Sequence, residues 1–163
     1  MIKKAATSVR YRIFRHRPYE KTCEQMRNFT LSRNSETKDE VWFLDHLPVF
    51  TIGKLGKLVN LLWETKIPVA QSDRGGDVTY HGPGQLVVYL LLDLARRKLG
   101  VRQLVSLIED TLICLLSSYG IRASTMEQAP GVFVGRKKIG FLGLRIRGGK
   151  TYHGFSLNID MDL

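Results

Sequence analysis

Several chemically useful residue types are concentrated in one short stretch, Arg74 to Gln85, which reads RGGDVTYHGPGQ. Gly75 and Gly76 allow the backbone to take φ > 0 or to approach a ligand closely. Their N–H groups are candidates to stabilise the oxyanion of an acyl transfer. His81 is a candidate acid or base because imidazole titrates near neutral pH. The competing interpretations are a glycine-rich surface loop and a His81 that hydrogen-bonds its own loop.

Lys138 is the second candidate for chemistry. It opens an expected strand over 138–146, directly after Arg136 and Lys137. Because side chains alternate along a strand, Lys137 and Lys138 point to opposite faces, and one of them is expected to point inward. An ammonium beside a thiol favours the thiolate and lowers the thiol pKa. Three solvated cations in a row are the alternative.

A shortened copy of the first stretch occurs near the end of the sequence. Residues 74–82 read RGGDVTYHG, and residues 147–154 read RGGKTYHG. We hypothesise that the two segments meet at one pocket, with His81 and His153 on opposite walls. Coincidence is the competing explanation, since two copies do not make a repeat protein.

The elements that must position these residues are visible in the hydrophobic pattern. Leu86 to Leu94 is almost continuously apolar, which indicates a strand buried on both faces. Two helices are expected, over 18–32 and over 101–119, with Gly120 ending the second. The apolar stripe predicted for the second helix comprises Val101, Leu104, Val105, Ile108, Leu112, Leu115, Leu116 and Tyr119.

Shorter strands and connections complete the expected elements. The thiols Cys23 and Cys114 are interpreted as small packing groups on the two helices. We expect an edge strand over 10–15, strands over 41–44, 49–52, 121–126 and 132–134, a mobile linker over 53–66, a basic connection over 95–99, a loop over 147–154 and a half-buried strand over 155–163.

Composition limits the classes of function. The chain has 163 residues, enough for one domain, with a net charge of +10. There is no apolar run long enough to span a membrane and no signal-peptide core, so a cytoplasmic protein without membrane contact is expected. The positive charge suits an acidic partner, either nucleic acid or an acidic carrier protein. No metal-ligand spacing and no Walker loop occur, so no cofactor is expected.

The sequence resembles lipoyl(octanoyl) transferases, also called lipoate-protein ligase B. The resemblance rests on IPVAQSDRGGDVTYHGPGQ, on DHLPVFTIG over 45–53, on APGVFV over 129–134, and on KIGFLGLR over 138–145 with HGFSLN over 153–158. It implies one catalytic domain over 1–163 with an α/β (α+β) fold, a mixed sheet packed by helices as in biotin and lipoate ligases.

The resemblance also implies an activity. Family members move an octanoyl group from acyl carrier protein to a lysine on lipoyl domains of 2-oxoacid dehydrogenase and glycine-cleavage subunits, through a cysteine thioester on the enzyme. A monomer is expected, and nucleic acid is not an expected partner.

The family's functional residues can be carried over by motif. Its catalytic lysine, which activates the cysteine, falls on Lys138. Phe141 replaces a residue that is usually small, which implies a narrowed acyl tunnel. The acyl-binding segments fall on Arg74, Gly75, Gly76, Asp77, Val78, Thr79, Tyr80 and His81, on Phe141, Leu142 and Gly143, and on Gly154, Phe155 and Ser156.

One departure from the family pattern concerns the nucleophile. The family cysteine lies in a P-C-G segment shortly after the N-x-D-x-D-L strand, and this sequence stops at Leu163. Neither Cys23 nor Cys114 matches that position, so we expect a C-terminally truncated transferase that forms no acyl-enzyme as given. The alternatives are an inactive acyl- or lipoyl-domain-binding relative, an ATP-dependent lipoate ligase and a basic nucleic-acid-binding domain.

Overall fold

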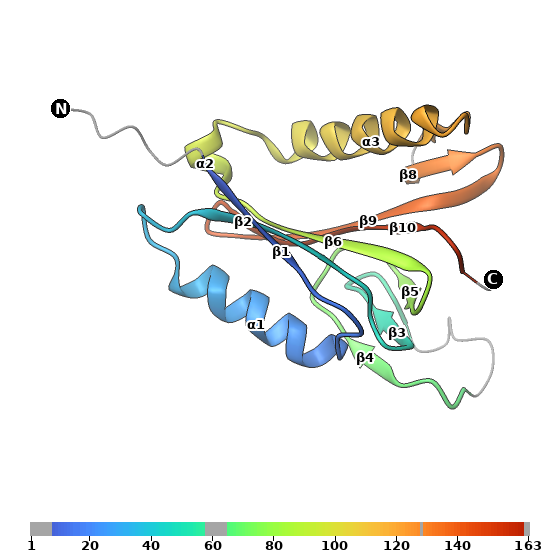
Figure 1. Ribbon diagram of the computed structural model, residues 1–163. Helices are drawn as coiled ribbons and strands as arrows, with labels where there is room; N and C mark the ends of the chain where they lie inside the picture. The colour runs from blue at the N-terminus through green and yellow to red at the C-terminus, as the bar shows by residue number, and fades with distance from the viewer. Residues whose placement is uncertain (1–7, 58–64, 128, 162–163) are drawn as a thin grey trace.

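A mixed seven-stranded β-sheet forms the centre of the computed structural model, which describes residues 8–57, 65–127 and 129–161 (Figure 1). In spatial order its strands are β1 (Val9–Ile13), β2 (Asp39–Leu44), β6 (Gln85–Leu91), β10 (Lys150–Asn158), β9 (Lys137–Arg147), β8 (Ala129–Val134) and β7 (Ser124–Met126). Strands β1 and β2 pair in parallel, and the other neighbours are antiparallel. This confirms the expected mixed sheet and the edge strand.

Helices cover both faces of this sheet, and a smaller sheet lies beside α1 (Figure 1). The helices are α1 (Tyr19–Ser32), α2 (Leu94–Arg97) and α3 (Val101–Ser118). The small sheet has the order β4 (Val69–Gln71), β3 (Val49–Ile52) and β5 (Val78–His81). The expected basic connection over 95–99 is therefore partly the short helix α2, whose first turn is capped by the Asp93 side chain.

Strand β6 is buried on both faces, as its apolar run predicts. Val87, Tyr89 and Leu91 pack with Met26 and Trp42 on the α1 side. On the other face, the residues packed with α3 are Val88, Leu90 and Leu92. This strand therefore separates two cores, and its α1-facing side chains supply part of the site described below.

Helix α3 contacts the sheet through a narrower stripe than the sequence pattern predicted. Leu104, Ile108, Leu112 and Leu116 are buried. The predicted members Val101, Leu115 and Tyr119 are exposed by 43%, 40% and 76%. A helix lying on one sheet buries only the residues directly beneath it, so the flanks of the stripe remain in solvent. Within the described ranges, no helix has the length and apolar character that a membrane span needs.

Two expectations for residues 147–163, one for a loop and one for a strand, differ from the structure. The loop over 147–154 is only a tight turn at Gly148 and Gly149, both with positive φ, and β10 starts at Lys150. The strand expected over 155–163 belongs to β10 and ends at Asn158, with Ile159 exposed by 67%. The first expectation treated part of the β9–β10 hairpin as irregular, and the second extended the strand beyond its end at Asn158.

The beginning of the expected mobile linker is held by the RGG stretch. The N–H groups of Gly53, Lys54 and Leu55 donate to the carbonyls of Asp77, Arg74 and Gly76 at 3.1–3.2 Å. A Cβ at Gly53 would collide with the Gly76 carbonyl, so glycine permits this close approach. Part of the linker, residues 58–64, lies outside the described residues.

Candidate functional site

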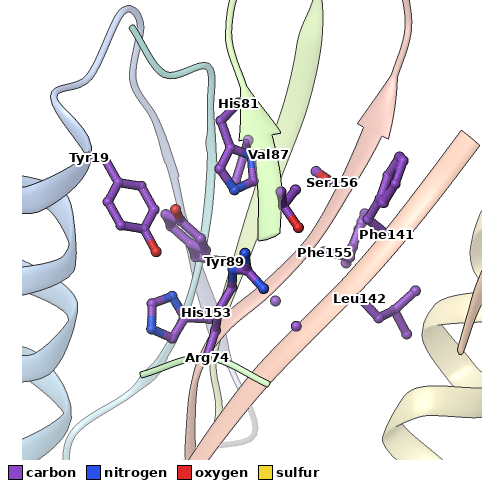
Figure 2. Close-up of a pocket in the computed structure, with 13 residues that line it drawn as sticks. Tyr19, Arg74, His81, Val87, Tyr89, Phe141, Leu142, His153, Phe155 and Ser156 are labelled. Carbon is purple, nitrogen blue, oxygen red and sulfur yellow. The ribbon is translucent and has the colours of Figure 1, made fainter. Parts of the chain in front are cut away.

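A buried pocket lies between the main sheet and α1, where the three segments expected to bind an acyl chain come together (Figure 2). Its cavity volume is ≈ 30 Å³, which is room for one or two water molecules. The expected site residues that line it are Arg74, Thr79, His81, Phe141, Leu142, Gly143, Gly154, Phe155 and Ser156. Tyr19, Val87, Tyr89 and His153 complete the lining.

The remaining expected residues support the wall without lining it. Gly75 donates its N–H to the Leu144 carbonyl at 3.1 Å, so this N–H is not free to bind an oxyanion as we had expected. Gly76 has φ +84 and lies against the Arg74 guanidinium. Val78 pairs with Ile52 in the small sheet. The Asp77 carboxylate accepts from the Val78 N–H at 2.7 Å, and the Tyr80 ring packs on Phe50 at 5.2 Å.

Arg74 places a buried cation in the pocket. Its Nη2 donates to the Thr51 carbonyl at 2.8 Å and to Thr51 Oγ1 at 2.7 Å, and its Nη1 donates to the Gly75 carbonyl at 2.9 Å. These acceptors are neutral oxygens, and burial lowers the pKa of the guanidinium. A Cβ at Gly143 would press on the Arg74 side chain, which explains a glycine inside β9.

The hydrogen bonds of His81 determine its tautomer. Its Nδ1 lies 2.6 Å from Gln85 Oε1. The Gln85 amide nitrogen donates to the Tyr80 carbonyl and to Asn158 Oδ1, so Oε1 must accept and Nδ1 must donate. Burial lowers the pKa of His81 to about 3. The neutral ring therefore bonds its own segment, as the competing interpretation predicted, and its Nε2 keeps a lone pair.

His153 is held in an uncommon conformation by Asp73. Its φ is +57, a left-handed value that is rare outside glycine. Its Nε2 donates to Asp73 Oδ1 at 2.9 Å, and the Tyr152 hydroxyl donates to Asp73 Oδ2. These hydrogen bonds hold the pKa of Asp73 well below its usual range, while burial lowers the pKa of His153. The opposite ring nitrogen, Nδ1, is buried and has no hydrogen-bond partner among the described residues.

Both histidines line the same pocket, which confirms that part of the hypothesis. They belong to the same polar end of the pocket rather than to opposite walls, and of the second segment only His153 and Gly154 line it. The two histidines come from strands β5 and β10 rather than from loops. A third histidine, His46, lies beside them, with its ring centroid 5.7 Å from that of His81. Its Nδ1 donates to the Arg17 carbonyl at 2.8 Å, so its Nε2 accepts from the Tyr89 hydroxyl at 2.6 Å.

Lys138 lies next to the pocket, on the far side of Phe141. Its Nζ is 5.3 Å from the Phe141 ring centroid and 5.6 Å from that of Phe133, and it donates to the Pro130 carbonyl at 2.6 Å. Partial burial lowers its pKa, against the opposing charge of Glu109. Lys137 is exposed, so the predicted difference between the two lysines is confirmed.

The two thiols are not beside this ammonium. Cys114 is exposed on α3, across the main sheet from the pocket, so its expected packing role was wrong. Cys23 lies on α1, where it packs against the core on the α1 side and against the cluster that contains Tyr19. Burial raises the pKa of its thiol to about 11. In the described part of the chain, no three His, Cys, Asp or Glu side chains are placed to hold a metal ion.

Three residues that line the pocket were not predicted as site residues: Tyr19, Val87 and Tyr89. His46 and Asp73, which hydrogen-bond to Tyr89 and His153, were not predicted either. Tyr89 gave a usable signal, because a phenol inside a strand buried on both faces must find a hydrogen-bond partner. Asp73 adjoins the RGG stretch, but its partners are 79 and 80 residues away in sequence. Local patterns do not reveal such contacts.

Comparisons with known proteins agree with this architecture. A family model described as the lipoyl protein ligase A/B catalytic domain matches residues 18–163. The octanoyltransferase of Pseudomonas entomophila is 60% identical to this chain, over 90% of the chain and 68% of the relative. Those of Dechloromonas aromatica and Escherichia coli O139:H28 are each 56% identical, over 89% and 90% of this chain and 71% and 68% of theirs.

Solved structures share the fold at low sequence identity. Lipoate-protein ligase A bound with ATP superposes with a TM-score of 0.75 and 16% identity, over 96% of this chain and 68% of the other. A bipartite lipoate protein ligase of Thermoplasma acidophilum gives a TM-score of 0.69 and 18% identity, over 96% and 63%. At these identities the likeness establishes the α/β fold alone.

Proposed function

Because the chain belongs to the lipoyl protein ligase A/B catalytic-domain family, and its relatives at 56–60% identity are octanoyltransferases, we propose that it transfers an octanoyl group to a lysine of a lipoyl domain. The donor is octanoyl-acyl carrier protein. The thioester C–S bond breaks, an amide C–N bond forms, and a thiol and a proton are released.

The observation that carries this proposal is the pocket itself. Three segments that are far apart in sequence, residues 74–81, 141–143 and 154–156, meet around one buried cavity with Lys138 at its edge. The cavity is too small for an acyl chain as it stands, so the chain enters when the partly exposed Phe141 ring moves aside.

Lys138 acts at the head of the chain in this proposal. An ammonium beside the thioester stabilises negative charge on a thiolate or on the tetrahedral oxyanion. The Pro130 carbonyl and the rings of Phe133 and Phe141 hold the ammonium at this position. Its partial burial strengthens the interaction, because charges attract more strongly outside bulk water.

Neither Cys23 nor Cys114 carries the acyl group in this proposal. Cys114 is exposed on the opposite face of the sheet, and Cys23 has a raised thiol pKa that disfavours the thiolate. Incubation with octanoyl-acyl carrier protein, followed by peptide mass spectrometry, should detect no octanoyl thioester on either residue. An adduct on one of them would contradict this assignment.

The transfer is tested with the gene product, octanoyl-acyl carrier protein and an unmodified lipoyl domain. Intact-mass measurement should show one octanoyl group on one lysine of the lipoyl domain, without ATP. Modification that requires ATP and free lipoate would instead identify an ATP-dependent ligase. Unmodified lipoyl domain under both conditions would contradict the proposal.

A further inference from the structure

The pocket has two unlike ends (Figure 2). The ring of Phe141 lies at the apolar end and is partly exposed, so this end is the opening. Leu142 and Phe155 also line this end, but their side chains pack towards the core on the α3 side. The other end is closed by side chains that are polar and buried, with 2–7% exposure: Tyr19, Arg74, His81, Tyr89 and His153. An acyl chain that enters tail first therefore points its methyl group at the polar end, with its carbonyl near Lys138.

Three members of this polar end, His81, Tyr89 and His153, already donate their hydrogen atoms to protein acceptors. His81 donates through Nδ1 to Gln85, His153 donates through Nε2 to Asp73, and Tyr89 donates its hydroxyl hydrogen to His46. His81 Nε2, His153 Nδ1 and the Tyr89 oxygen are therefore hydrogen-bond acceptors. His153 Nδ1 is buried without a hydrogen-bond partner in the part of the chain that the structure describes.

Acceptors of this kind suit water and disfavour hydrocarbon. The cavity of ≈ 30 Å³ has room for a water molecule that can donate to them. A methylene group has no hydrogen to donate, so a chain that reaches this end displaces the water and leaves buried acceptors unsatisfied. The expected penalty is about tenfold or more in affinity.

The distance between the two ends suits a chain of medium length. Phe141 is paired with Ser156 of β10, and His153 precedes Ser156 by three residues. At the usual rise of a strand, the backbone positions of Ser156 and His153 are roughly 10 Å apart. We propose that the wall formed by Arg74, His81, Tyr89 and His153 sets the upper limit on the length of the acyl chain. This inference rests on the proposed function, because it takes the chain to bind in this pocket.

The test measures dissociation constants for saturated fatty acids from hexanoic to tetradecanoic acid by titration calorimetry. In the wild-type protein, affinity should rise with chain length and then fall about tenfold once the chain reaches the wall. His81→Phe keeps a ring stacked on Tyr19 but removes the lone pair. His153→Asn shortens the wall with a residue that tolerates positive φ. Each variant should move the fall to longer chains by at least two carbons.

Val87→Ala is the matched control, because it enlarges the pocket between the two ends. It should change affinity for all chain lengths by a similar factor and leave the position of the fall unchanged. If His153→Asn does not fold, His81→Phe decides the test. A fall at the same length in the folded variants as in wild type would overturn this inference alone. No binding of any acid by wild type would overturn the proposed function and the inference together.

Discussion

Lys138 reaches the pocket because β9 contains one extra residue. Val132 pairs with Gly140, but Phe133 pairs with Lys138, so Ile139 has no partner and forms a β-bulge. In a regular strand, Lys138 and Phe141 would point to opposite faces, since they are three residues apart. The bulge brings Lys138 to the face of Phe133 and Phe141, where its ammonium contacts both rings.

The first prediction concerns the charge at this position. Lys138→Ala should lower the rate of octanoyl transfer by roughly a hundredfold or more, because it removes the cation beside the reacting thioester. Affinity for octanol, which has no carboxylate to pair with the ammonium, should change little, since Lys138 does not line the cavity. Single-turnover transfer and calorimetry measure the two effects. Lys137→Ala, at the exposed neighbour, should transfer at nearly the wild-type rate; an equal loss there would rule out a specific role for Lys138.

The second prediction concerns pH. Burial lowers the pKa of His81 to about 3 and that of His46 to about 4, whereas both titrate near 6.5 when unfolded. Between these values the unfolded chain binds more protons than the folded protein, so stability rises with pH. Below pH 6.5, each histidine should cost about 1.4 kcal/mol of unfolding free energy per pH unit. This loss should end near the folded pKa.

Urea titrations at several pH values between 7 and 4.5 measure this slope. His81→Phe should reduce it by the contribution of one histidine. Carboxylates with lowered pKa values, such as Asp73, begin to lose their contribution only below about pH 5, so the slope is taken between pH 6.5 and about 5. A flat stability profile between pH 7 and 4.5 would contradict the assigned neutral state.

Residue types predicted part of the site, and long-range contacts determined the rest. The donor-rich stretch at Arg74 and the lone inward-facing Lys138 were recognisable because their types and spacing are unusual for a surface. The role of Asp73 was not, since its partners Tyr152 and His153 belong to a hairpin at the other end of the chain. The left-handed φ of His153 also has no local sequence signal.

At the scale of elements, α3 gives the third prediction. Leu112 is 1% exposed, whereas Leu115, in the same predicted stripe, is 40% exposed. Leu112→Ala should lower the unfolding free energy by about 2–5 kcal/mol, because it leaves a cavity in the core on the α3 side. Leu115→Ala should change the unfolding free energy by no more than about 0.5 kcal/mol. Equal losses in urea denaturation would show that the helix packs through a broader face than described.

The hydrophobic pattern predicted most elements but failed at the β9–β10 hairpin. The helical spacing of apolar residues located α1 and α3, and the continuous run of apolar residues located β6. Residues 147–154 were read as a loop because two glycines are flanked by charged and polar residues. A two-residue Gly-Gly turn between strands is itself a hairpin signal. The strand was not recognised because its polar residues Thr151 and His153 are buried and form hydrogen bonds to groups far away in the sequence.

At the scale of the whole molecule, the charge of +10 bears on association with the partner proteins. Electrostatic steering raises the association rate when the partner is acidic, and salt weakens it over a Debye length of about 8 Å at physiological ionic strength. Steering depends on where the charge lies relative to the site. Arg136, exposed at the turn that precedes Lys138, is therefore expected to matter more than a cation elsewhere.

The fourth prediction compares two substitutions that change the net charge equally. Arg136→Glu should lower kcat/KM for octanoyl-acyl carrier protein several-fold at low salt, because it places a like charge where an acidic carrier approaches. Arg102→Glu, in the exposed first turn of α3 and at the other end of that helix from β8 (Figure 1), should have a much smaller effect. Raising the salt concentration should reduce the difference between the two variants.

A small neutral octanoyl thioester is the control, and both variants should use it equally well. An equal decrease in kcat/KM for the carrier protein in both variants would show that net charge alone governs association. The turn at Arg136 would then not be the docking side.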